Sequence, residues 1–120
     1  MEMKPAVASL AALAHEGRLA AFRLLVQAGP MGLAAGEVAR RLDVLPNTLS
    51  ASLSVLSHAG LIASRRAGRS VIYTADYDAM RELLAFLMED CCAGKPEICA
   101  PLAAAASGAC STGREMNPAQ

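Results

Sequence analysis

Long apolar segments are missing from the 120-residue sequence, which has nothing near the roughly 20 consecutive apolar residues that a membrane-spanning helix needs. The N-terminal segment MEMKPAVASLAALAHEG does not read as a secretory signal, because its short Ala-rich run carries one Lys and two acidic residues. We therefore expect a cytoplasmic protein without a membrane partner. Since the cytosol keeps thiols reduced, clustered cysteines are expected to bind metal or act in redox chemistry rather than form structural disulfides.

The usual marks of an enzyme are also missing. The sequence has no nucleophile beside a general base, no Gly-rich phosphate loop and no paired His and Asp, and its only histidines are His15 and His58. We expect a protein that is not an enzyme, requires no cofactor and acts on no small-molecule substrate. His15 is expected to cap the helix that follows it or to lie on the surface, and His58 to be a polar surface or phosphate-facing residue.

Net charge is absent too, since 11 basic residues balance 11 acidic ones. The charges are nevertheless separated along the chain. Residues 40–69 hold five arginines and one Asp, a local charge of +4, whereas residues 76–97 hold six acids and two basic residues, a local charge of −4. A basic region can follow a phosphate backbone whatever the net charge of the protein.

Apolar residues recur at helical spacing through most of the chain. Leu49, Leu53 and Leu56 form the inward stripe of one such segment, whose polar residues are expected to face outward. Leu33 is expected on the apolar face of a shorter segment before it. The four predicted helices of this half are residues 5–14, a segment ended by Gly29-Pro30, residues 34–42, and a segment that starts at Pro46 and ends at Gly60.

The pattern then changes to strand, turn and strand. Leu61-Ile62 and residues 71–73 flank the segment RRAGR, in which Gly68 provides the turn. A further helix follows, and its apolar face comprises Met80, Leu83, Leu84 and Leu87. Because periodicity ends near Gly94, we expect a domain over residues 1–92 and a C-terminal loop and mobile tail over residues 93–120.

This order of elements predicts a mainly α protein with a small β-hairpin wing (α+β), that is, a winged helix-turn-helix. Small polar side chains on the helix that starts at Pro46 can reach base edges in the major groove, and arginines on the hairpin can meet phosphates or the minor groove. A Ser- and Thr-rich helix can also be plain solvated surface, but the order of elements favours DNA binding. The predicted DNA contacts are Asn47, Thr48, Ser50, Ala51, Ser52, Ser54, Arg65, Arg66 and Arg69.

The segments LSASLSVLSHAGLI and RRAGRSVIY resemble the ArsR/SmtB family of bacterial metal-responsive repressors, and the resemblance covers about residues 5–92. It implies transcription regulation by a homodimer, built on the first and last helices, that sits on operator double-stranded DNA and leaves when metal binds. The family usually has a His where this chain has Ser52. That difference is expected to alter base preference and not the fold, because the position is expected to face outward.

Members of the family bind arsenic through cysteines of the helix before the recognition helix, or zinc through Asp and His pairs of the last helix, and neither site has a counterpart here. The helix before the recognition helix, LAAGEVARRL, has no cysteine, and the last helix has no histidine. The end of the chain is instead similar to a subgroup of arsenic repressors, and this likeness implies that Cys91, Cys92 and Cys99 bind As(III), and also Sb(III), as inducer. Three thiolates suit these thiophilic ions better than tetrahedral zinc, which usually takes four ligands. The resemblance thus implies a repressor of an arsenic resistance operon.

Helix geometry restricts how these thiols can meet. Neighbouring residues of an α-helix point about 100° apart, so Cys91 and Cys92 converge on one ion only where the helix ends, before Gly94. Arsenic binding is then expected to close the loop to Cys99, restrain or rotate the dimer helix and misplace the recognition helices.

Other interpretations of the cysteines stay open. Cys91 continues the apolar stripe of the last helix and can be a small buried hydrophobe, and Cys110 can be an extra thiol. Two thiols would suffice for methylated trivalent arsenicals. A thiol redox sensor could instead pair Cys91 or Cys92 with Cys99, since adjacent cysteines form a disulfide only with strain.

Overall fold

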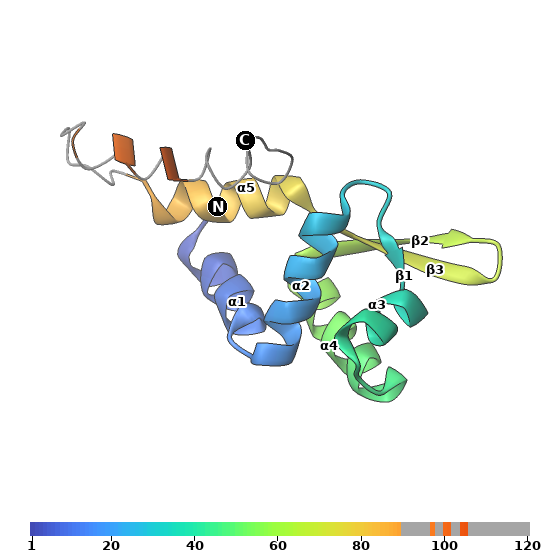
Figure 1. The fold of residues 1–120 in the computed structure, drawn as a ribbon. Helices are drawn as coiled ribbons and strands as arrows, with labels where there is room; N and C mark the ends of the chain where they lie inside the picture. Colours follow the sequence, from blue (N-terminus) through green and yellow to red (C-terminus); the bar gives the residue numbers. More distant parts are fainter. Residues whose placement is uncertain (90–96, 98–99, 102–103, 106–120) are drawn as a thin grey trace. The chain divides into compact units, whose positions relative to one another are not determined.

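The computed structural model describes residues 1–89, 97, 100–101 and 104–105 of the chain. Backbone contacts divide the chain into a first unit, Met1–Phe86, and a second, Leu87–Gln120. The predicted boundary between residues 92 and 93 lies outside the described residues. In chain order, the elements are α1 (Met3–Leu13), α2 (Glu16–Ala28), β1 (Leu33–Ala34), α3 (Ala35–Leu42), α4 (Pro46–His58), β2 (Ile62–Ala67), β3 (Ser70–Ala75) and α5 (Tyr77–Leu87) (Figure 1).

The predicted mainly α fold with a hairpin wing is confirmed. Helices α2 and α4 end next to Gly29 and Gly60, as the sequence predicted. These two glycines have φ angles of 82° and 77°, which favour glycine. His15 caps α2 as predicted, because its Nδ1 accepts hydrogen bonds from the backbone N–H groups of Gly17 and Arg18 at 3.1 and 3.3 Å. These local signals position the helices that carry the site.

A strand that the sequence did not predict lies between α2 and α3. Leu33 was expected on the face of a helix, but Leu33 and Ala34 form β1, which pairs antiparallel with β3 in a sheet of order β1-β3-β2. Two residues are too few to show strand alternation, so the pairing depends on tertiary contact. Gly32 permits it, because a Cβ there would lie 2.4 Å from the carbonyl oxygen of Tyr73 and φ is +74°.

The hairpin strands are longer than predicted. β2 and β3 pair from Ile62 opposite Ala75 to Ala67 opposite Ser70, so that only Gly68 and Arg69 remain at the turn. Gly68 has a φ of 63°, as the predicted turn requires. The hairpin extends away from the helices in Figure 1. Its end is therefore available as a wing.

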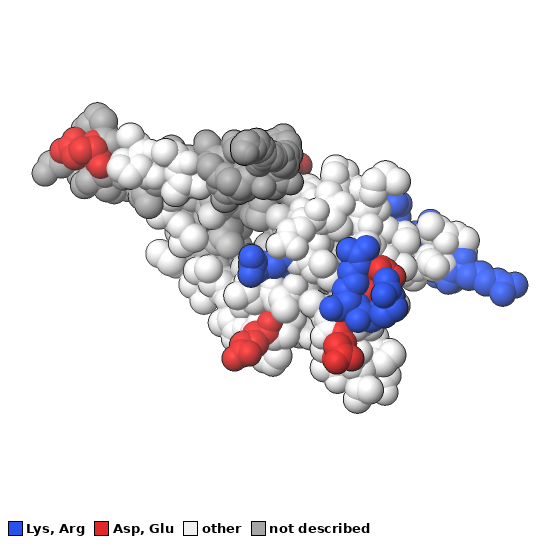
Figure 2. All heavy atoms as spheres, in the orientation of Figure 1, with Lys and Arg blue, Asp and Glu red and all other residues white. Residues whose placement is uncertain are grey.

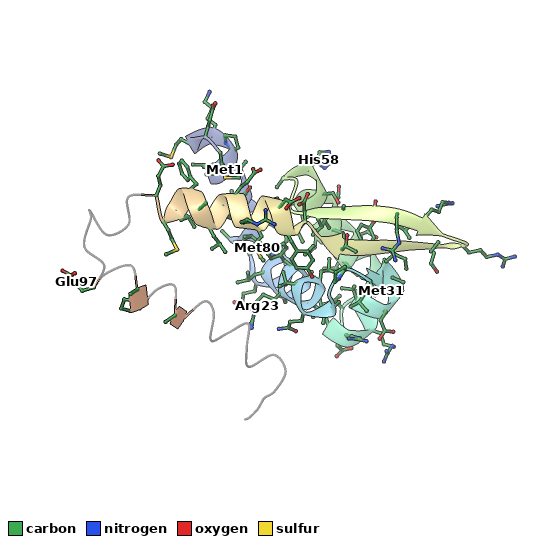
Figure 3. The ribbon with its side chains drawn as sticks, turned by 90° about the horizontal axis from the view of Figure 1, so that it is seen from above. Met1, Arg23, Met31, His58, Met80 and Glu97 are labelled. Atoms are coloured by element: carbon green, nitrogen blue, oxygen red, sulfur yellow. The ribbon has the colours of Figure 1, made fainter. Side chains whose placement is uncertain are left out.

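The core is built from apolar side chains of the four helices α1 to α4 and from the end of the β2–β3 hairpin nearest to them. Leu25, Leu56 and Val38 have no exposed surface, and Leu61 has 1%. Met80 of α5 packs against this cluster beside α2 (Figure 3). The predicted stripe Leu49, Leu53 and Leu56 is confirmed as core. A helix held on one side by this core presents its opposite side outward.

Two polar contacts fasten the outer helices to α2. The Tyr77 hydroxyl at the start of α5 donates to the Val26 carbonyl at 3.0 Å. Arg18 donates from Nε to the Ala12 carbonyl at 2.6 Å and from Nη2 to the Ala11 carbonyl at 3.2 Å. The bonds to Val26 and Ala12 satisfy carbonyls near helix C-termini, whereas the Ala11 carbonyl also accepts the backbone N–H of Ala14 at 3.2 Å.

The expected apolar face of α5 is only partly covered. Leu83 is buried, but Leu84 and Leu87 are 49% and 51% exposed. None of the helices within the described part of the chain is long and apolar enough to cross a membrane.

Candidate nucleic-acid interface

The outer side of α4 presents small polar side chains to solvent. Asn47, Ser50, Ala51 and Ser54 are exposed, as their predicted role at base edges requires. They recur at spacings of three and four residues and thus share one side of the helix, opposite the buried leucines. Pro46 at the first helical position fixes the start of α4. The described geometry is that of a recognition helix able to enter a major groove.

The expectation that Ser52 faces outward is wrong. Its side is set by the fact that it lies three residues after Leu49 and four before Leu56, both of which are buried. Ser52 is only 8% exposed, and it lines a cavity of about 120 Å³ with His15 and Thr48. Ser52 therefore packs toward α2 in this structure and does not join the outward polar side.

Thr48 stands at the border between the two sides of α4. It is exposed, yet it also lines the cavity that holds Ser52. His58, at the other end of the helix, is exposed as expected, and its Nδ1 lies 2.9 Å from the Ser54 carbonyl oxygen. The outward side of α4 therefore runs from Asn47 to His58.

The turn between α3 and α4 consists of residues 43–45. Asp43 ends α3 in the left-handed conformation with a φ of 55°, and its backbone N–H bonds the carbonyls of Ala39 and Arg40. Leu45 follows as the N-cap of α4, is 73% exposed and makes no capping hydrogen bond with its side chain. Leu45 was not among the predicted DNA contacts, although an apolar residue stands out at a position that favours Ser, Thr, Asp or Asn.

The arginines of α3 are held by one carboxylate. Glu37 accepts hydrogen bonds from Nε of Arg40 at 3.1 Å and from Nε of Arg41 at 2.7 Å, and it also contacts Arg40 Nη2. The bonds from Arg40 and then from Arg41 lower the pKa of Glu37 from 4.5 to about 2, and the same contact raises the pKa of Arg40. Figure 2 shows acidic and basic groups side by side here. This part of the basic region is thus partly neutralised.

The arginines of the wing point in different directions. Arg65 and Arg66 are consecutive on β2, so their side chains lie on opposite faces of the hairpin. Arg65 pairs with Ile72 and donates from Nη2 to the Met31 carbonyl at 3.0 Å, whereas Arg69 lies at the turn. All three are exposed, and Figure 2 shows basic side chains at the hairpin end. Arg66 and Arg69 are therefore the better placed for phosphate contact.

The cysteine part of the predicted site cannot be placed. Cys91, Cys92, Cys99 and Cys110 all lie outside the described residues. Among residues 1–89 and the few described beyond them, no three His, Cys, Asp or Glu side chains are grouped as metal ligands would be. The three-thiol site stays a prediction.

The described geometry is similar to that of known regulators. Residues 13–65 match a helix-turn-helix domain family. An ArsR-like transcriptional regulator from Rhodococcus sp. RHA1 is 27% identical with a TM-score of 0.66, over 88% of this chain and 93% of that one. Reduced HlyU from Vibrio cholerae N16961 is 33% identical with a TM-score of 0.57, over 70% of this chain and 88% of that one.

A third similar structure is a homodimeric winged helix-turn-helix DNA-binding domain (fragment 1–100) from Mycobacterium bovis, solved by solution NMR and named as a possible ArsR-family transcriptional regulator. It is 27% identical with a TM-score of 0.60, over 71% of this chain and 77% of that one. No protein of curated function matches the chain in sequence.

A tight turn, an outward polar helix and an arginine-bearing hairpin, in that order, define a winged helix-turn-helix transcriptional regulator, which binds DNA and is not an enzyme. The likeness to the regulators above narrows that class. The chain belongs to the ArsR family of transcriptional regulators.

Proposed function

We propose that this regulator is a homodimeric repressor of an arsenic resistance operon, released from operator DNA when trivalent arsenic, and also antimonite, binds Cys91, Cys92 and Cys99. The observation that carries the proposal is the C-C-x6-C spacing just beyond α5. Three thiolates with no His among them match the trigonal coordination of As(III), and soft sulfur ligands select such ions over hard cations. Operator release follows if ligation rearranges the chain at the end of a dimer helix.

The dimer is supported by apolar side chains on α1 and α5. Met3, Val7 and Leu10 recur at i, i+4 and i+7 on α1 and are 65%, 55% and 41% exposed, and Leu84 of α5 is 49% exposed. Such a stripe on the surface of a small protein is typical of an interface. The similar domain from Mycobacterium bovis is homodimeric. Two subunits would present two α4 helices to successive major grooves, as two-fold regulators do.

The inducer is tested by fluorescence anisotropy on DNA from upstream of the gene. Arsenite is titrated into complexes of the wild type, of Cys99→Ser and of Cys110→Ser, the last being the matched control because it removes a thiol outside the C-C-x6-C group. We expect release of the wild type and of Cys110→Ser, and no release of Cys99→Ser. Equal release of all three would show that Cys99 is not a required ligand. Retention of all three on DNA would show that the signal is not arsenite.

A second candidate is a repressor that responds to oxidation of its thiols. It is supported by the 33% identity to HlyU, whose structure was determined for the reduced protein. In this case peroxide would oxidise the thiol of Cys99 and that of Cys91 or Cys92 to one disulfide. The two protons and two electrons that the thiols lose would reduce the peroxide to two water molecules. DNA release by peroxide without arsenite, reversed by dithiothreitol, would favour this function over arsenic sensing.

A further inference from the structure

The start of α4 carries an exposed leucine that the core and the proposed dimer do not use. Leu45 is 73% exposed, whereas the exposed apolar residues of α1 and α5 belong to the proposed dimer faces. Val44, the residue before it, packs against the core and fixes the turn. Leu45 is therefore held in place by its neighbours while its own side chain remains in solvent.

The backbone explains why the side chain projects from the turn. Leu45 has φ −68° and ψ 143°, the extended conformation that a following proline imposes, so the helix cannot extend back to include it. Leu45 immediately precedes Pro46 and lies two residues before Asn47, at the N-terminal end of α4. In a helix-turn-helix complex, the residues at this end of the recognition helix face the base edges. A side chain at this place is positioned to approach the major groove in such a complex.

A leucine here is costly for the isolated protein. The N-cap position favours Ser, Thr, Asp or Asn, and a helix that lacks such a residue is less stable. Leu45 makes no side-chain capping bond, so the sequence forgoes that stabilisation and exposes an aliphatic side chain as well. Binding can recover the loss if the leucine meets an apolar partner.

We propose that Leu45 is a specificity-determining residue that contacts the C5-methyl group of a thymine in each half-site. In the major groove that methyl is the apolar group that distinguishes thymine from the other bases, and apolar side chains read it by contact. The outward polar residues Asn47 and Ser50 next to it supply hydrogen bonds but no aliphatic contact. The inference rests on DNA binding by this family and is independent of arsenic.

The test uses deoxyuridine, which lacks only the methyl group of thymine. The full-length wild type enriches duplexes from a random pool without arsenite, and these duplexes are then prepared with thymines partly replaced by deoxyuridine. Uracil cleavage of the bound and unbound fractions shows which methyl groups binding needs. We expect at least one thymine per half-site at which deoxyuridine weakens wild-type binding about fourfold, the value of one buried methyl group.

Two variants complete the test. Leu45→Ser should lose the sensitivity at that thymine alone, while its thermal unfolding midpoint stays at or above that of the wild type because serine caps α4. Met31→Ser is the matched control, since Met31 is 77% exposed in the α2–β1 connection, at the opposite end of the first unit from the α3–α4 turn (Figure 1). It should keep the wild-type pattern.

Identical interference patterns for the wild type and Leu45→Ser, or no thymine at which deoxyuridine matters, would overturn the contact. If the wild type enriches no duplex at all, DNA binding itself fails. That outcome is distinct from a duplex that binds without regard to thymine methyl groups.

Discussion

At the scale of single residues, backbone conformation and close contact decide which substitutions the protein tolerates. Gly32 turns the chain into β1 with a positive φ and has backbone and side-chain atoms of β3 against it. Gly36, four residues later, lies in α3 with open space around the position of a Cβ. The same substitution should therefore have opposite effects at these two glycines.

We expect Gly32→Ala to destabilise the protein by about 2 kcal/mol or more, because the new Cβ combines a strained φ with a clash against the Tyr73 carbonyl. Gly36→Ala should stabilise it by about 0.5–1 kcal/mol, since alanine has less backbone entropy to lose in a helix. Urea unfolding followed by circular dichroism measures both. Equal effects of the two substitutions would contradict this account.

The ionisation of Glu37 makes the free energy of unfolding depend on pH in the acidic range. Its pKa is lowered from 4.5 to about 2 in the folded protein by bonds from Arg40 and Arg41, so its stabilising contribution is complete above about pH 4.5 and is lost as the pH falls toward 2. Unfolding free energies of the wild type and Glu37→Gln, measured from pH 6 to pH 2, should differ most at the high end and converge at the low end. A constant difference would contradict the pKa shift.

At the scale of elements, the start of α5 is tied to the end of α2 by a hydrogen bond from the Tyr77 hydroxyl to the Val26 carbonyl, across 51 positions of sequence. The Val26 carbonyl would ordinarily accept from the backbone N–H four residues on, but that residue is Pro30, which has none. The Tyr77 hydroxyl takes its place. A local feature of the α2 terminus thus positions the helix that leads to the cysteines.

We expect Tyr77→Phe to lower the unfolding free energy by about 1 kcal/mol or more, because the ring is kept and the partly buried Val26 carbonyl loses its donor. Tyr73→Phe is the matched control, since no hydrogen bond of the Tyr73 hydroxyl is among those found in the described residues. Thermal unfolding of the two variants measures the difference. Comparable losses for both would show that the Tyr77 bond is not responsible.

At the scale of the whole molecule, the proposed dimer requires the apolar side of α1. Val7 is 55% exposed at the centre of the Met3, Val7 and Leu10 stripe. Val7→Glu should convert the dimer to monomer and weaken operator binding by at least tenfold, because each subunit then binds one half-site alone. Leu19→Glu, on a 42% exposed residue of α2, should leave the dimer intact. Analytical ultracentrifugation measures the oligomeric state and fluorescence anisotropy measures operator binding. A Val7→Glu variant that remains dimeric, or a Leu19→Glu variant that becomes monomeric, would contradict the prediction.

Much of the fold could be predicted from local signals. Three kinds of local signal were confirmed: the spacing of the leucines, Gly29, Gly60 and Gly68 at helix ends and at the turn, and His15 before a helix. Each of these signals acts within a few residues. The outward residues Asn47, Ser50, Ala51 and Ser54 follow from the same periodicity. Ser52 could have been placed correctly too, since its spacing from Leu49 and Leu56 puts it on the buried side.

The order of helices and hairpin and the polar side of α4 could be predicted in advance, because they depend on residue type and short spacing. Three contacts emerge only once the elements pack: Leu33 pairs with β3, the Tyr77 hydroxyl bonds the Val26 carbonyl, and Arg65 bonds the Met31 carbonyl. These contacts join residues distant in sequence. Their partners are chosen by how the elements pack, which no local pattern records.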